Sequence, residues 1–333
     1  MPKAAHSSGS RVAPWVVLAM LGMLALPAAI TLNTVQEPGK LILSTSNPTP
    51  HGYTWSLLLF VIPTIVIAFW LLPSEHVKFS RSSFWRTIGL LAPFGCGLDF
   101  FFAHRFFTFP NSAATLSVGA PALGAPVPVE EYIFYITGFI TVLLLYIWLD
   151  EYWLAAYNVP DYSGQAKMMP RLLQFHPGSA IAGVLLIAGA IVFKKFFSAS
   201  REGFPGYFTF LVSAGLLPAA SFYPVAKRFI NWRAFSLTLF FILLVSLLWE
   251  ATLALPYGWW GYQPNQMVGI SIRGWSGLPI EAVFVWIAVT YATTVVFEVV
   301  KIWRASEKPL RRALLGEKRP SPAVKSHVAG REA

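Results

Sequence analysis

Four carboxylates recur at matching positions in the two halves of this chain. They are Asp99 and Glu130 in the first half, and Glu250 and Glu281 in the second. The two acids of each half are 31 residues apart, and the halves are offset by 151 residues. In both halves the second acid follows a proline by two residues, within Pro-Val-Glu-Glu-Tyr and Pro-Ile-Glu-Ala-Val. Because titratable groups gathered in one site are candidates for proton transfer, this register predicts acid–base chemistry.

The two kinds of acid lie in different predicted surroundings. Asp99 and Glu250 each lie within an apolar, aromatic run, where a carboxylate costs at least about 2.5–3.5 kcal/mol unless it is paired, hydrated or protonated. Glu130 and Glu281 instead lie in the first turn of a predicted helix, where the helix dipole favours the charged form. Glu131 adds a third acid to the first half. Acids held in unlike environments suit the roles of proton donor and proton acceptor.

Structural roles could also account for these acids. A glutamate just after a proline commonly lies at a helix start and faces the helix dipole. Asp99 could neutralise His104 or Arg105 near the end of its own run. Glu298 lies three residues before Lys301, a spacing typical of a structural ion pair on a helix. The acids expected to be solvated in a loop are Asp150, Glu151 and Asp161.

Aromatic residues accompany the acids. Residues 106–128 carry no charge, and residues 256–278 carry only Arg273. Tryptophan and tyrosine near the end of a span commonly form a belt at the membrane interface. An aromatic face can also stabilise a carbocation, by about 2 kcal/mol or more in a dry site. The candidates for such walls are Phe134, Tyr257, Trp259, Trp260 and Phe284.

The elements that carry these residues are predicted to be membrane-spanning helices. Residues of the set AVILMFWYC make up 56% of the chain, charged residues make up 12%, and the mean hydropathy is +0.58. Soluble proteins carry about 25% charged residues, so a soluble fold is excluded. A bilayer is spanned by roughly 20 apolar residues. The runs that approach this length are 12–31, 53–72, 87–105, 129–148, 178–193, 204–224, 232–255 and 279–300.

We therefore expect an all-α fold, a polytopic membrane helix bundle of about 8 spans built as two parallel repeats of about four spans each. Parallel repeats would bring both Pro-x-Glu elements to the same side of the membrane. The first run could instead be a cleaved signal peptide. The expected units are 1–52 (tail, first span and loop), 53–150 (first repeat), 151–203 (connecting loop and fifth span), 204–303 (second repeat) and 304–333 (basic tail).

Charge predicts a multi-pass protein of the cell membrane with both termini in the cytoplasm. The net charge is +10, and its basic residues flank the apolar runs or accumulate in the C-terminal tail. This placement indicates topology and contact with membrane lipid rather than binding of nucleic acid. Cys96 is the only cysteine, which excludes intrachain disulfides and cysteine-based metal sites. The histidines lack metal-ligand spacing and no nucleotide-binding glycine motif occurs, so we expect no metal and no cofactor.

The motifs resemble the lycopene cyclase domain of the heterodimeric and fungal-fusion type. The first match is Pro-Val-Glu-Glu-Tyr-Ile-Phe at 128–134, and the second is Pro-Ile-Glu-Ala-Val-Phe at 279–284. The resemblance covers roughly 53–150 and 204–303, so the two small helical domains of that family would lie in one chain. Ala282 stands where the family motif has its second glutamate.

The resemblance implies ring closure at one end of a linear carotenoid, a hydrophobic polyene, without net redox change. It implies that Glu130, Glu131 and Glu281 transfer protons, and that Asp99 and Glu250 hold or relay them. The aromatic candidates named above would face the cation. The carotenoid, the number of ends modified and the oligomeric state stay open.

Three alternatives remain. Water could capture the same cation before the ring closes, which would make the chain a hydratase of carotenoid ends. Intramembrane acids and parallel repeats are also typical of proton-coupled transporters. Ala282 could instead mark a non-catalytic subunit that has lost its activity.

Overall fold

The computed structural model describes residues 49–72, 80–159 and 163–316. Within these ranges, seven helices are long and apolar enough to cross a membrane, which confirms a mainly helical, membrane-embedded chain. Each corresponds to a predicted run, whereas the first predicted run, 12–31, and Asp161 lie outside the described residues. The seven helices are α2 (Gly52–Leu71), α3 (Arg81–Phe106), α4 (Val129–Trp148), α6 (Pro177–Phe196), α7 (Gly206–Ala226), α8 (Trp232–Trp249) and α9 (Glu281–Ser306).

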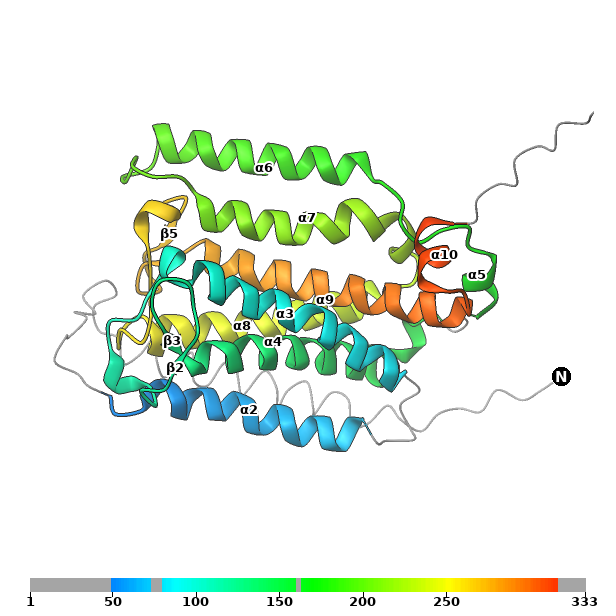
Figure 1. Cartoon of the computed structure of the whole chain (residues 1–333), viewed down its shortest axis with the longest axis horizontal. Coiled ribbons are helices and arrows are strands. Elements are labelled where there is room, and N and C mark those ends of the chain that lie inside the picture. The colour runs from blue at the N-terminus through cyan, green and yellow to red at the C-terminus, as the bar shows by residue number, and fades with distance from the viewer. Residues whose placement is uncertain (1–48, 73–79, 160–162, 317–333) are drawn as a thin grey trace, which may run out of the picture.

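The long helices lie side by side along the long axis of the molecule (Figure 1). α4 and α9 form the centre of the bundle. α4 packs against α2 and α3, α9 packs against α7 and α8, and the two central helices contact each other. α6 packs on α7 at the edge of the bundle. Two short helices, α5 (Ser163–Met168) and α10 (Leu310–Leu315), lie together at one end.

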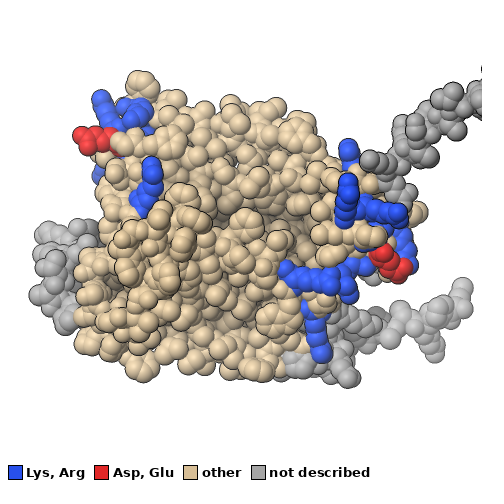
Figure 2. All heavy atoms as spheres, in the orientation of Figure 1, with Lys and Arg blue, Asp and Glu red and all other residues tan. Residues whose placement is uncertain are grey.

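The outer faces of the bundle are apolar. Leu59, Phe69 and Leu185, for example, are 76%, 78% and 66% exposed. Figure 2 shows the charged residues at the two ends of the molecule, with a broad uncharged belt between them. A belt of exposed apolar side chains on this scale is unfavourable in water and is explained by contact with the hydrocarbon core of a bilayer.

Helices α3 and α8 begin in the same way. The side chain of Ser80 caps α3 by accepting a hydrogen bond from the backbone N–H of Ser83, and Asn231 caps α8 through the N–H of Ala234. Ser80 and Asn231 are 151 residues apart, the same offset that relates the acids. Both residue types are favoured at this position because the side-chain oxygen satisfies an N–H that has no partner in the helix.

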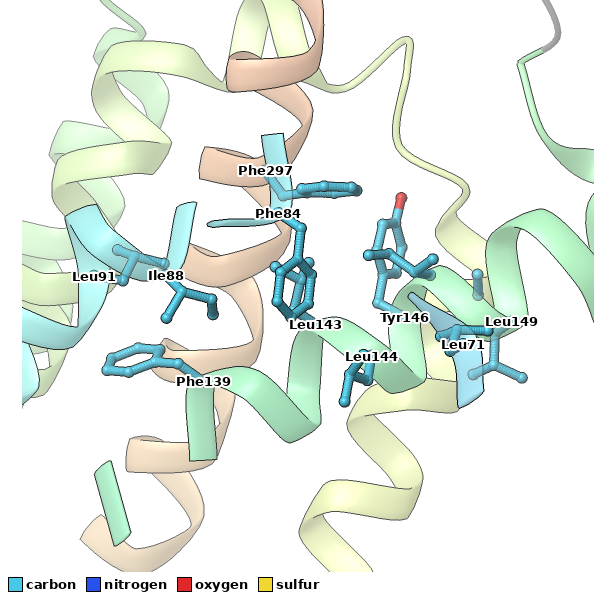
Figure 3. Close-up of a cluster of buried hydrophobic side chains, with 12 residues drawn as sticks. Leu71, Phe84, Ile88, Leu91, Phe139, Leu143, Leu144, Tyr146, Leu149 and Phe297 are labelled. Carbon is cyan, nitrogen blue, oxygen red and sulfur yellow. The ribbon is translucent and has the colours of Figure 1, made fainter. Parts of the chain in front are cut away.

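The packed core between α3, α4 and α9 is apolar (Figure 3). Phe84 comes from α3, Leu143 and Tyr146 from α4, and Phe297 from α9, and each is at most 1% exposed. Because lipid is as apolar as these side chains, close packing holds the helices together more than exclusion from water does. This core positions α4 and α9, the helices that carry the Pro-x-Glu glutamates at their starts.

Three short antiparallel strand pairs lie in the loops at one end of the bundle, which we call the hairpin end. The all-α expectation did not include them. The pairs are β1 (Phe107–Thr108) with β4 (Gly261–Tyr262), β2 (Gly119–Ala120) with β3 (Val127–Pro128), and β5 (Ser271–Ile272) with β6 (Leu278–Pro279). Loop backbone at a membrane surface needs partners for its N–H and C=O groups, and these pairs supply some of them. Strands of two residues are too short to leave a periodic pattern in the sequence.

The opposite end holds a buried group of charges. The expectation that Asp150 and Glu151 are solvated is wrong for Asp150, which is 1% exposed. The reason is that α4 continues as a π-turn over Leu149–Trp153, which brings both acids to α9. Lys301 Nζ lies 3.8 Å from a carboxylate oxygen of each acid and 3.2 Å from Glu298 Oε1. The last contact confirms the ion pair predicted for Glu298. We call these four residues the Lys301 cluster.

Candidate active site

Side chains from both halves of the chain surround one cavity near the hairpin end, which we call the acid cavity. Its volume is about 40 Å³. Glu131 of α4 and Glu250 of the second half both line it. Most of its other wall residues are aromatic, namely Tyr53, Phe107, Phe134, Tyr135, Tyr207, Trp260, Tyr262 and Trp286. The fold thus brings together one carboxyl group from each half within an aromatic enclosure.

Glu131 reaches the acid cavity from the first turn of α4. Its Oε1 accepts a hydrogen bond of 2.7 Å from the hydroxyl of Tyr53, in the first turn of α2. Glu131 is 7% exposed and Tyr53 is 1% exposed. Tyr53 is held in place by Trp260, with the two ring centroids 5.0 Å apart. A tyrosine hydroxyl is a neutral donor, so it orients the carboxyl group without fixing its charge.

Glu250 reaches the acid cavity from a π-turn, Glu250–Ala254, that continues α8. Its Oε2 accepts a hydrogen bond of 2.5 Å from the hydroxyl of Tyr262 in β4. Burial, followed by the nearby charge of Glu250, raises the pKa of Tyr262 well above its usual value near 10. The Tyr262 hydroxyl therefore stays protonated, and remains a donor, at neutral pH. π-turns are rare and are found frequently at functional sites.

Asp99 does not line the acid cavity. It is completely buried on α3, and its charge interacts with that of Glu131. Neither of its carboxylate oxygens has a hydrogen-bond partner among the residues that the structure describes. The ring of His104, a candidate partner of Asp99 by sequence, bonds instead to the backbone oxygen of Ala125 at 2.8 Å. A buried carboxyl group without a partner is costly when charged, which suits a group that stores a proton.

Glu130 and Glu281 are placed alike, and neither lines the acid cavity. Oε1 of Glu130 accepts hydrogen bonds from the N–H of Leu116 at 2.8 Å and from the hydroxyl of Thr54 at 2.5 Å. Oε1 of Glu281 accepts one from the N–H of Val268 at 2.6 Å. In both side chains Oε2 is buried and has no partner within the described segments. These hydrogen bonds attach each glutamate to the loop before its helix. We therefore assign both glutamates the role of positioning those loops.

The five aromatic candidates separate into two groups. Phe134 and Trp260 line the acid cavity. Both pack against Trp249, at centroid distances of 5.7 Å and 4.8 Å. The other three do not line it. Tyr257 stacks on Trp259 at 6.0 Å, beside Tyr53, and Phe284 packs against Phe208 at 4.7 Å.

Sequence reasoning missed the tyrosines of the site. The spacing of Tyr135 does indicate it as a site residue, because it lies four residues after Glu131 and so on the same helix face. Trp286 occupies the matching position of α9, 151 residues after Tyr135. No local pattern links Tyr53 to Glu131, however, because the two residues are 78 positions apart and meet only through the packing of α2 against α4.

The acid cavity offers carboxyl groups, tyrosine hydroxyls and aromatic faces. Such groups can add a proton to an apolar molecule, remove one from it and stabilise a positive charge in between. Within the described ranges, no group of three His, Cys, Asp or Glu side chains is arranged to hold a metal ion. Comparison of the chain with protein-family models, with curated proteins and with solved structures gives no match.

Proposed function

We propose that this chain is a membrane enzyme that closes a ring at the end of a linear carotenoid, by acid-initiated chemistry without net redox change. The acid cavity is the observation that carries the proposal, because it places one carboxyl group from each half against aromatic walls. The likeness of both Pro-x-Glu motifs to the lycopene cyclase domain supports the same reaction. The apolar outer belt supports a substrate that reaches the protein from the bilayer.

In the proposed reaction, a protonated carboxyl group adds its proton to the terminal double bond of the carotenoid. The new C–H bond leaves a tertiary cation on the neighbouring carbon. The π electrons of a second double bond attack this cation and form the C–C bond that closes the ring. A carboxylate then removes a proton from the carbon beside the new cation and restores a double bond. One proton enters and one leaves, so the product is an isomer of the substrate.

Glu131 and Glu250 are the proposed catalytic residues, since both line the cavity. They come from different halves, so the donor and the acceptor can face different parts of the substrate. Tyr53 and Tyr262 orient them through their hydroxyl groups. Asp99 interacts with the charge of Glu131, which supports a role in storing or relaying the proton.

The aromatic walls are proposed to stabilise the cation. Each ring face can contribute about 2 kcal/mol or more in a site without water. Phe134 and Trp260 are the wall residues that the sequence also indicates. A dry cavity would in addition keep water from capturing the cation, which favours ring closure over hydration.

We also propose that residues 53–150 and 204–303 are two parallel repeats that build this one site. Three matched features support this: the caps Ser80 and Asn231, the glutamate-to-loop hydrogen bonds of Glu130 and Glu281, and a strand pair just before each of those helices. The repeats are not equivalent in chemistry, because Ala282 occupies the position of Glu131. The two repeats would therefore form a single site in each chain.

The proposed orientation places the α5 and α10 end in the cytoplasm. Cytoplasmic loops of membrane proteins are enriched in Lys and Arg. Among the described residues, the hairpin end carries fewer basic residues, namely Arg105, Lys194, Lys195, Arg201 and Arg273. Those described at the α5 and α10 end are Arg81, Arg86, Lys167, Arg171, Lys227, Arg228, Arg233, Lys301, Arg304, Lys308, Arg311 and Arg312.

Expression in a bacterium that accumulates lycopene tests the function. Chromatography of the extracted pigments should show rings at one or both ends of the carotenoid. Glu131→Gln should reduce ring formation by about 100-fold or more, the usual contribution of a proton donor or acceptor, at an unchanged protein level. Glu307→Gln is the matched control, because this exposed residue lies at the other end of the bundle. Hydroxylated ends would indicate a hydratase instead, and unchanged lycopene would overturn the proposal.

A further inference from the structure

A larger cavity lies among the loops of the hairpin end, and we call it the loop pocket. Its volume is about 460 Å³, within the range of sites that hold small molecules. Most of its wall comes from the loop between α3 and α4, which contains the paired strands β2 and β3 (Figure 1). Gln263, just after β4, completes the wall from the second half of the chain. The loop pocket shares Phe107 alone with the acid cavity, so it is a separate site.

The polar groups of the loop pocket are neutral. Four hydroxyl groups and two side-chain amides line it, and they belong to Thr108, Ser112, Thr115, Ser117, Asn111 and Gln263. None of its described wall residues is Lys, Arg, Asp or Glu. A phosphate or carboxylate ligand would therefore find no cationic side chain, and an ammonium ligand would find no carboxylate. These walls favour a ligand that carries several hydroxyl groups and no charge.

Several of these polar groups have no partner within the fold. Three hydroxyl groups and one amide make no side-chain hydrogen bond to any residue that the structure describes, namely those of Thr108, Ser112, Ser117 and Gln263. Hydroxyl groups and amides both donate and accept hydrogen bonds, as the hydroxyl groups of a ligand also do. A ligand that matches them gains hydrogen bonds without breaking any that the fold uses.

The walls of the loop pocket are held in place by the protein itself. The N–H of Val129 donates to the carbonyl oxygen of Val118 at 3.0 Å, beside the pair of β2 with β3. The side-chain amide of Asn111 donates to the carbonyl oxygen of Tyr257 at 3.0 Å, which attaches the loop to the second half. Ser117 has a φ of 60°, a left-handed conformation that costs energy in a serine and is often found at ligand sites. A site that is already shaped loses less conformational entropy when a ligand binds.

Apolar groups complete the match to a sugar. Phe107 and Phe109 line the loop pocket, and an aromatic ring can pack against the C–H groups on one face of a sugar. We propose that the loop pocket binds a neutral sugar ring. Two sources supply such a ring at a membrane surface, the headgroup of a glycolipid and a free sugar. In the same loop, Leu116, Val118 and Leu123 are exposed, which favours the glycolipid because its acyl chains can contact them.

Lipid binding to the full chain tests the proposal. The protein is placed in nanodiscs of phosphatidylglycerol and phosphatidylethanolamine that also contain monoglucosyl diacylglycerol, and native mass spectrometry identifies the lipids that it retains. The wild type should retain the glycolipid in preference to phosphatidylglycerol. The double variant Thr108→Val, Gln263→Leu should weaken this retention about 10-fold or more, because it removes two hydrogen-bonding groups and nearly keeps the shape of both side chains. Gln165→Leu is the matched control and should bind as the wild type does, because this exposed residue of α5 lies at the other end of the bundle.

Free glucose added to the same nanodiscs distinguishes the two sources. Displacement of the glycolipid would show that the ring binds without its acyl chains, and no displacement would show that the site requires the whole lipid. Both results support the proposal.

Three results would overturn it: no retention of the glycolipid by the wild type, equal retention of phosphatidylglycerol, or equal retention by the double variant and the Gln165→Leu control. Ser112→Phe, which adds a ring at the pocket wall, replaces the double variant if that variant does not accumulate. Ring formation is not the readout here, so this proposal and the proposed function can fail separately.

Discussion

Buried acids lie at both ends of this bundle, but their partners differ. At the hairpin end, Glu131 and Glu250 accept hydrogen bonds from tyrosine hydroxyls. No Lys, Arg or His of the described segments lies within 4.0 Å of either carboxylate. At the opposite end, three acids surround the ammonium group of Lys301.

The difference separates acids whose partners are neutral hydroxyl groups from acids that share one cation. The acids of the Lys301 cluster share one buried ammonium group in an ion network. A hydroxyl can donate to a carboxylate and can also face a protonated carboxyl group. The acid cavity therefore has the partners that proton transfer needs, whereas the Lys301 cluster has those of a structural network.

The largest expected effect is on the chemistry of the hairpin end. Glu250→Gln should reduce ring formation by about 10²–10⁴-fold, because it removes one of the two groups that exchange a proton with the substrate. Product formed per folded protein, measured by pigment chromatography, checks this. Glu151→Gln, which changes an acid of the Lys301 cluster, should leave turnover per folded protein unchanged. Equal losses in the two variants would remove the distinction between the ends.

The largest effect on stability is expected at the other end. Lys301→Met should destabilise the folded protein by about 3–5 kcal/mol, because it leaves buried carboxylates without their cation. Thermal unfolding in detergent would measure the loss. The double variant Lys301→Met, Glu298→Gln should recover part of it, since it removes one of the uncompensated charges. A single variant as stable as the wild type would show that the network contributes little.

A smaller effect on turnover is expected from the hydroxyl donors. Tyr262→Phe should lower ring formation roughly 10-fold or more, because a hydrogen bond to a charged group contributes about 1.5–3 kcal/mol. The loss should be smaller than that of Glu250→Gln, since the carboxyl group stays in place. Comparison of the two turnover rates, with unfolding temperatures recorded for both, checks the order. A Tyr262→Phe variant with full activity would mean that Glu250 needs no orienting donor.

The smallest effect is expected at a helix cap. Ser80→Ala should lower the stability of the fold by about 1 kcal/mol, because the N–H of Ser83 loses its acceptor. Turnover per folded protein should not change, since α3 begins at the end opposite the acid cavity. The unfolding temperature and the ring yield, measured on one preparation, test both statements. A lower ring yield at an unchanged unfolding temperature would contradict the prediction, because it would mean that this cap affects catalysis at the other end of the bundle.

Much of the fold could be predicted because lipid imposes simple rules on the sequence. Hydropathy located the seven helices that the structure describes, and the expense of a charge in lipid singled out Asp99 and Glu250. The exact membership of the site could not be predicted. Glu130 and Glu131 are neighbours in the sequence, yet only Glu131 lines the cavity. Neighbours on a helix face different directions, and only the packing of α2 and α8 against α4 determines which one faces the cavity.

The burial of Asp150 illustrates a second limit. In the sequence it follows the end of an apolar run, which is typical of a solvated loop. Its burial depends on the π-turn after α4 and on the position of Lys301 along α9, 151 residues later in the chain. A single sequence contains no local sign of either feature.

The pairing of β1 with β4 has a consequence for how this molecule assembles. Phe107 and Tyr262 are direct partners in that pair, and both line the acid cavity. If the chain were divided into two polypeptides between α5 and α6, each product would carry only one of the two acids. The β1–β4 pair, which joins Phe107 and Tyr262 at the cavity wall, would form only when the fragments associate. Association of the fragments and completion of the reaction centre would then be a single event.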